Sequence, residues 1–176
     1  MQKNWYIIYT KPKCEKKVAA LLTKKRIENF SPVNCKEIKS SKKSKVIYEP
    51  LFDCYVFTYI DEKDIDQLKQ IDRIVSLVYW KGMPAIINDD EIKIIKEFTS
   101  DYQNIKLVRN RVNINDLAGV IEGPSYSLDG KVLTVKNKKV KVNLPSLGFI
   151  MIAELEKESI RYSEVSFVNR ELSLLK

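Results

Sequence analysis

The chain has 176 residues, of which 44% are hydrophobic, so it can form one large or two small domains with real cores. It contains no histidine, which excludes Ser–His and Cys–His nucleophile pairs as well as histidine metal ligands. The three cysteines, Cys14, Cys35 and Cys54, lack Cys-x-x-Cys spacing, so we expect neither a disulfide framework nor a zinc site.

The net charge of +8 is concentrated in the first quarter of the chain. Residues 1–48 hold 13 Lys or Arg and 3 Glu, a local charge of +10, whereas the remainder holds 18 basic and 20 acidic residues, a local charge of −2. Such asymmetry is typical of a protein that binds a polyanion, most often nucleic acid. A solvated surface explains the same charge equally well, so composition leaves both interpretations open.

No apolar run reaches the length of a membrane span, and the sequence from Met1 to Trp5 lacks the pattern of a signal peptide. We therefore expect a cytoplasmic protein that has no membrane partner. We also expect a monomer.

The first predicted elements are a strand and a basic helix. Trp5–Thr10 is apolar on both faces, as expected of a strand, and Lys11-Pro12 ends it. From about Lys13 to Ile27 apolar residues recur with a helical period and should face a core. This stripe consists of Cys14, Val18, Leu21 and Leu22. Lysines form a second stripe suited to a phosphate backbone, although a charged helix face is usually only solvated.

A second strand is predicted at Val33–Ile38, and a lysine-serine tip follows at 39–45. The run Glu49–Ile60 is predicted as the central strand, because aromatic and β-branched residues dominate it. Alternation places Phe52 on one face and Tyr55 on the other, and both faces are apolar. One face can serve the core, whereas the other requires a helix of the same chain or a partner.

Residues 61–70 are predicted as a short helix, and 73–80 as a strand that ends at a Lys81-Gly82 turn. Asn88 is expected to cap a helix whose first turn is acidic, where negative charge suits the helix dipole. The polar stretch after Thr99 shows no clear period and is predicted as a linker.

Short strands alternate with turns after the linker, and four of the five glycines lie between Gly119 and Gly148. This pattern predicts a small β-barrel. The expected strands cover 119–124, 130–135, 139–143 and 149–153. A helix is expected in the tail at 158–176.

Four motifs occur in a fixed order over residues 3–157. They are Trp5-Tyr6 with Tyr9 and Glu15-Lys-Lys-Val18, Glu49-Pro-Leu-Phe52 with Tyr55-Val-Phe57, Gly119-Val-Ile-Glu-Gly-Pro124 with Gly130-Lys-Val132, and Leu147-Gly148. In this combination the chain resembles the NusG family of transcription elongation factors, and the third motif is similar to the KOW motif. The basic first helix, the second motif and the lack of a large central insertion resemble the specialised UpxY and RfaH-type antiterminators.

The resemblance implies an α+β fold. An N-terminal NusG-type (NGN) domain, with an antiparallel sheet and flanking helices, is expected at 1–99. A linker at 100–110 would lead to a C-terminal all-β SH3-like KOW barrel at 111–157, followed by the tail at 158–176.

The resemblance also implies an elongation and antitermination factor that suppresses pausing and termination on specific operons. Its partners would be the clamp helices of the largest RNA polymerase subunit and upstream duplex or non-template DNA. The residues that match polymerase-binding positions are Tyr9, Phe52, Tyr55 and Phe57. Those that match nucleic-acid-binding positions are Lys11, Lys13, Lys17, Lys24, Lys25 and Arg73. For each aromatic residue the alternative is an ordinary place in the core.

The chain departs from the family pattern at two places. Asp53-Cys54 replaces the usual Pro-Gly or Pro-Asn before Tyr55. Leu147-Gly148-Phe149 stands where housekeeping members carry Phe-Gly-Arg, so Leu147 and Phe149 are the expected KOW partner-binding residues. The missing arginine argues against the termination factor Rho and leaves a small-subunit ribosomal protein as an open partner. The alternative function is a ribosome-associated KOW-domain RNA-binding protein.

We expect no enzymatic activity, cofactor or metal. No base lies near the cysteines in the sequence, and no Gly-rich phosphate-binding loop occurs. The acidic pair Asp89 and Asp90 is better explained as a helix start than as a catalytic pair.

Overall fold

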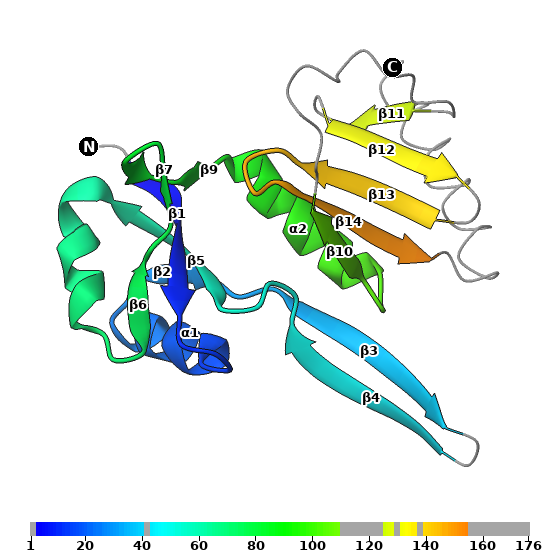
Figure 1. The fold of residues 1–176 in the computed structure, drawn as a ribbon, viewed down its shortest axis with the longest axis horizontal. Coiled ribbons are helices and arrows are strands. Elements are labelled where there is room, and N and C mark those ends of the chain that lie inside the picture. The colour runs from blue at the N-terminus through cyan, green and yellow to red at the C-terminus, as the bar shows by residue number, and fades with distance from the viewer. Residues whose placement is uncertain (1–2, 41–42, 110–124, 129–130, 137–138, 155–176) are drawn as a thin grey trace, which may run out of the picture.

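The computed structural model describes residues 3–40, 43–109, 125–128, 131–136 and 139–154. Its first sheet is antiparallel, with β1 (Lys3–Thr10) between β5 (Tyr55–Asp61) and β6 (Ile74–Leu77) (Figure 1). β1 pairs with β5 along most of its length, from Lys3 opposite Asp61 to Tyr9 opposite Tyr55. The sheet is completed by β2 (Glu28–Phe30) beside β5 and β9 (Ile86–Ile87) beside β1.

Helices of the same chain cover both faces of this sheet, because alternate side chains of its strands are apolar on each side. On one face Tyr6 and Ile8 share a core with α1 (Glu15–Lys24) and the 3₁₀-helix η1 (Glu62–Gln70). On the other face Trp5 and Phe57 share a core with α2 (Asp89–Asp101). The second apolar face of the predicted central strand is thus covered largely within the chain.

Helical periodicity located both α-helices correctly. Val18 and Leu22 of the predicted apolar stripe are fully buried in α1. In α2 the buried side is formed by Ile92, Ile95 and Phe98, and Asn88 occupies the predicted N-cap position. These residues fix how the two helices pack on the sheet.

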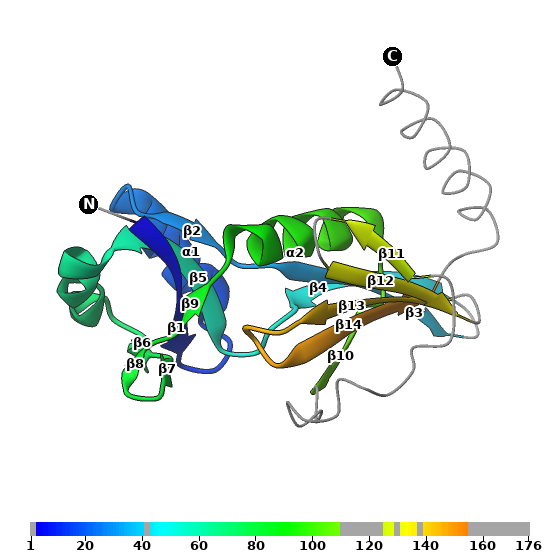
Figure 2. The ribbon, with the colours of Figure 1, turned by 90° about the horizontal axis from the view of Figure 1, so that it is seen from above.

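The C-terminal strands form a second antiparallel sheet of five strands, in the order β10-β14-β13-β12-β11. Their bounds are Lys106–Arg109 for β10, Ser125–Leu128 for β11, Lys131–Lys136 for β12, Lys139–Leu144 for β13 and Phe149–Glu154 for β14. Buried Val142 and Met151 belong to the same core as α2, which lies between the two sheets (Figure 2). In the described residues β10 and β11 lie at opposite ends of this sheet.

A ribbon of two long strands forms a separate element. β3 (Val33–Ser40) pairs only with β4 (Lys43–Pro50) in the described part of the chain, in a register from Val33 opposite Pro50 to Ser40 opposite Lys43. The ribbon projects away from the first sheet (Figure 1).

The predicted central strand Glu49–Ile60 is wrong as a single element. β4 ends at Pro50, and β5 begins only at Tyr55. The four residues between them make a turn in which Cys54 adopts a left-handed φ of 63°. The backbone N–H of Cys54 donates to Oε1 of the buried Glu15 at 2.7 Å, which holds the turn in place. Leu51 and Phe52 are therefore buried core residues of a turn.

Four further segments differ from their predictions or lie outside the described residues. The predicted strand at 73–80 is divided at Val78. The N–H of Val78 donates a hydrogen bond to the Ile7 carbonyl, and the Val78 carbonyl accepts one from the Ala85 N–H. The predicted linker at 100–110 includes the end of α2 and all of β10. The strand predicted at 119–124 and the tail helix at 158–176 lie outside the described residues.

Candidate functional site

An apolar groove of about 710 Å³ opens beside the first sheet. It is lined on one side by Tyr55 and on the other by the turn at 145–148 of the C-terminal sheet. Residues of a short hairpin and of β1 also line it. The lining side chains include Tyr55, Tyr79, Trp80, Met83, Ile86 and Leu147.

The hairpin consists of β7 (Tyr79–Trp80) and β8 (Met83–Pro84), joined by Lys81-Gly82. Both loop residues have positive φ, 50° and 82°, as a two-residue type I′ turn requires. Glycine suits the second position because it has no Cβ to strain there. The hairpin is anchored at its base by the bond from the Val78 N–H to the Ile7 carbonyl, at 2.9 Å.

The anchored hairpin holds large apolar side chains in solvent. Trp80 is 70% exposed, and Tyr79, Met83 and Ile86 are also at least half exposed. Contiguous exposed apolar surface of this kind marks an interaction site in a folded protein. These exposed residues were not among the predicted binding residues. The apolar pair directly before a Lys-Gly turn was the feature of the sequence that could have indicated them.

The structure divides the four predicted polymerase-binding aromatics into two pairs. Tyr9 is 41% exposed, and its ring meets that of the half-buried Tyr55 edge-on, with centroids 6.0 Å apart. Phe52 and Phe57 are buried, and their rings meet edge-on at 5.6 Å. Tyr9 and Tyr55 therefore offer surface to a partner, whereas Phe52 and Phe57 support that surface from the core.

The predicted partner-binding residues Leu147 and Phe149 lie next to residues of the N-terminal half of the chain. The Phe149 ring contacts the Phe52 ring edge-on, with centroids 5.9 Å apart. Leu147 lines the groove, and the N–H of Ser146 donates to Oε1 of the buried Glu91 at 3.1 Å. In this arrangement the two predicted binding sites therefore cover one another in part.

The predicted nucleic-acid-binding lysines, which we call the lysine row, lie on α1, at its ends and in the turn before it, and Arg73 lies in the turn before β6. The structure brings Lys11 and Arg73 together, since the Lys11 N–H donates to the Arg73 carbonyl at 2.9 Å. Lys17 and Lys24 are exposed on α1, and Lys13 and Lys25 are exposed just outside its two ends. Cations spread in this way can follow successive phosphates of a backbone.

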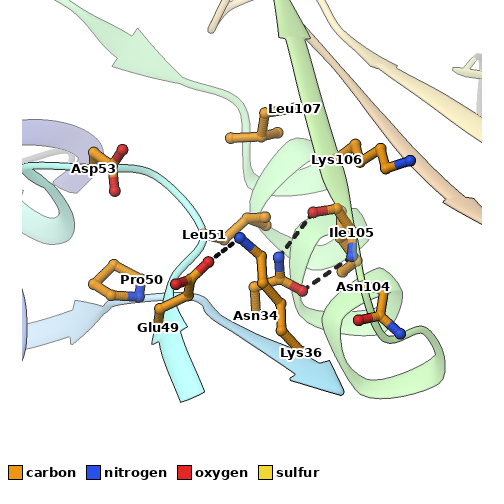
Figure 3. A pocket seen from close by; sticks show the side chains of 10 residues that line it. All are labelled: Asn34, Lys36, Glu49, Pro50, Leu51, Asp53, Asn104, Ile105, Lys106 and Leu107. Carbon is orange, nitrogen blue, oxygen red and sulfur yellow. Dashed lines mark hydrogen bonds and ion pairs between the residues drawn. The ribbon is translucent and has the colours of Figure 1, made fainter. Parts of the chain in front are cut away.

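A second pocket, of about 430 Å³, lies where the ribbon meets β10 (Figure 3). The buried Asn34 side chain bonds both backbone groups of Ile105, donating to its carbonyl at 2.8 Å and accepting from its N–H at 3.0 Å. Beside it, Lys36 and Glu49 form an ion pair across the ribbon. The segment that leads to the C-terminal sheet is thus tied to the base of the ribbon.

Cys54 is not an activated nucleophile. Partial burial, followed by the nearby carboxylates of Glu15 and Asp53, raises the pKa of the Cys54 thiol above its ordinary value. A raised pKa keeps the thiol protonated at neutral pH, and the thiol is the unreactive form. Within the described residues no three His, Cys, Asp or Glu side chains are placed to hold a metal ion, and no helix is long and apolar enough to cross a membrane.

A solved structure of NusG from Thermotoga maritima, titled for domain interaction in that protein, superimposes with a TM-score of 0.51. It shares 19% sequence identity and covers 89% of this chain and 94% of its own, which shows a common fold. No curated protein sequence matches the chain. The family model described as transcription termination factor nusG matches residues 3–96, more than half of the 176 residues. The chain therefore belongs to the NusG family.

Proposed function

We propose that this protein is an elongation and antitermination factor that binds the clamp helices of RNA polymerase through the aromatic groove. NusG is a family of transcription factors, which supports the general role. The observation that carries the specific proposal is the rigid hairpin that holds Trp80 and Met83 in solvent next to Tyr55. Helices commonly bind in apolar grooves, and aromatic residues dominate the energies of such interfaces.

The lysine row and Arg73 are the proposed contacts to upstream duplex or non-template DNA. Lysine contacts to phosphates give affinity and position but do not read bases. A protein that binds both the polymerase clamp and the DNA would favour the closed clamp. It can do so only if it binds that state more tightly than the open one.

Within the family we place the protein among the specialised UpxY and RfaH-type factors, which act on specific operons. The basic α1 and the Glu49-Pro-Leu-Phe52 motif support this placement. We also propose that 1–99 is an NGN domain and that the C-terminal sheet belongs to an SH3-like KOW barrel at 111–157. Residues 100–110 would connect these domains, and 158–176 would form a tail.

Adding the protein to transcribing RNA polymerase is expected to shorten pauses and raise read-through at terminators. About 1 kcal/mol of preference for the closed clamp would shift the clamp equilibrium about fivefold. Pause lifetimes in single-round transcription measure the effect, with Tyr55→Ala as the control that should bind polymerase poorly. Unchanged lifetimes at saturating wild-type protein would contradict the proposal. Co-purification of ribosomal subunits in place of polymerase would favour the ribosome-associated alternative.

Replacing Phe149 by alanine is expected to strengthen binding to polymerase about two- to tenfold, because an aromatic pair contributes about 0.5–1.5 kcal/mol beyond its buried area. The substitution weakens the contact with Phe52 that keeps Leu147 in the groove. Titration of labelled polymerase measures the change in Kd. Val108→Ala, an exposed position on β10 outside this contact, is the matched control. An unchanged Kd would show that the C-terminal sheet does not compete with polymerase.

A further inference from the structure

We propose that the β3–β4 ribbon is a second nucleic-acid site, which binds duplex DNA. Between Ile38 and Val46 the sequence consists of lysine and serine alone. Lys43 and Lys45 lie on β4 and are exposed. The ribbon is separate from the row of basic residues assigned above to α1, and its DNA binding does not require polymerase.

The register of the ribbon places Lys43 and Lys45 on the same face. Lys45 lies opposite Ile38, and Lys43 lies opposite Ser40. Directly opposed residues share a face of an antiparallel pair, and every second residue along a strand faces the same way. We call the face that carries Lys43, Lys45 and Ile38 the lysine face. Tyr48 lies on the other face, since it is an odd number of residues from Lys45.

The composition of the lysine face favours duplex DNA over other nucleic acids. Proteins that bind single strands use aromatic rings on which bases stack, and the one aromatic side chain of the ribbon, Tyr48, lies on the opposite face. The deep, narrow major groove of double-stranded RNA does not admit protein elements, whereas the DNA major groove accepts a two-stranded β-ribbon. Ile38, which is 52% exposed on the lysine face, is suited to contact a thymine methyl group.

The ribbon is long enough and well enough anchored to act as an arm. Eight residues in each strand span about 26 Å at the usual rise of about 3.3 Å per residue. An isolated two-stranded ribbon is only marginally stable in water, so its base needs support. The Asn34 clamp on Ile105 provides this support (Figure 3). The hydrogen bond from the Asn104 N–H to the Cys35 carbonyl, at 2.8 Å, adds to it.

A contact at the base of the ribbon connects it with α1. Lys16 Nζ donates to the carbonyl oxygen of Tyr48 at 3.4 Å, so the exposed basic face of α1 approaches β4 there. A duplex bound along the lysine face could thus continue toward α1. The direction in which the ribbon projects would then set the direction in which the bound DNA extends from the first sheet.

The test uses the full chain and DNA alone, and it compares the double variant Lys43→Gln/Lys45→Gln with wild type. The probes are a labelled duplex of about two helical turns and one of its strands, followed by fluorescence anisotropy over a range of salt. Loss of two phosphate contacts should lower the slope of log K against log salt by about 1.8 for the duplex. Binding of the single strand should stay at the wild-type level, and Lys43→Arg/Lys45→Arg should restore duplex binding.

Lys69→Gln/Lys93→Gln is the control, because it removes the same charge from exposed positions on η1 and α2. An equal loss in this control would overturn the proposal, as would an unchanged slope in the ribbon variant. An equal loss on the single strand would assign the ribbon to single-stranded nucleic acid and also overturn it. Lysines also prevent edge-to-edge association of exposed strands. A variant that precipitates but binds duplex normally while soluble would show that this is their only role. Polymerase binding is measured in a separate experiment. If the protein failed to bind polymerase, the outcome of this DNA-binding test would therefore not change.

Discussion

Replacing Phe57 by alanine is expected to lower the free energy of unfolding by about 3–5 kcal/mol. The Phe57 ring is 0% exposed and lies between the rings of Phe30 and Phe52, at centroid distances of 6.1 and 5.6 Å. Removing it leaves a cavity at the point where β5 packs toward α2. Denaturant unfolding followed by fluorescence of Trp5, which belongs to the same core, measures the loss.

Tyr9→Ala is the matched control, because the Tyr9 ring is 41% exposed near the end of the central strand β1 of the same sheet. It should change the free energy of unfolding by less than about 1 kcal/mol, as surface substitutions usually do. The comparison separates the two interpretations that the sequence left open for the aromatic residues. If Phe57→Ala unfolded like wild type but no longer bound polymerase, Phe57 would be a docking residue and its place in the core would be incidental.

Elements that depend on local periodicity could be predicted from the sequence. Val18 and Leu22 in α1, and Ile92 and Ile95 in α2, recur at helical spacing and are buried on one side. The acidic first turn that begins at Asp89 marked the start of α2 correctly. These features depend on side chains a few residues apart, which a single sequence displays directly.

Elements that depend on distant residues could not be predicted in this way. The turn that divides Glu49–Ile60 requires a left-handed Cys54, held by a carboxylate 39 positions earlier in the chain. No glycine or asparagine marks this turn, so the apolar run looked like one strand. The packing of Phe149 on Phe52 likewise depends on two segments far apart in the sequence. Of the four predicted polymerase-binding residues, only Tyr9 and Tyr55 are therefore accessible to a partner.

The second large effect is expected at the groove. Trp80→Ala should weaken binding to RNA polymerase by about 2–4 kcal/mol, which corresponds to about 30- to 1,000-fold in Kd. A tryptophan side chain has only two rotatable torsions and a large apolar ring, so it loses little rotamer entropy when it becomes buried in an interface. Tyr55→Ala should have a comparable effect on binding, because its half-buried ring lines the same groove.

Trp80 is the sharper test of the two, since its side chain is already 70% exposed and contributes little to the fold. Its loss should leave the unfolding midpoint close to that of wild type, whereas Tyr55→Ala also removes the edge-on contact with Tyr9. Val75→Ala provides the control, because Val75 is an exposed apolar residue on β6 that does not line the groove. Titration of labelled polymerase with each variant gives the Kd values. If Trp80→Ala bound as tightly as Val75→Ala, the groove would not be the polymerase site, and the exposed hairpin would need another partner to explain its apolar surface.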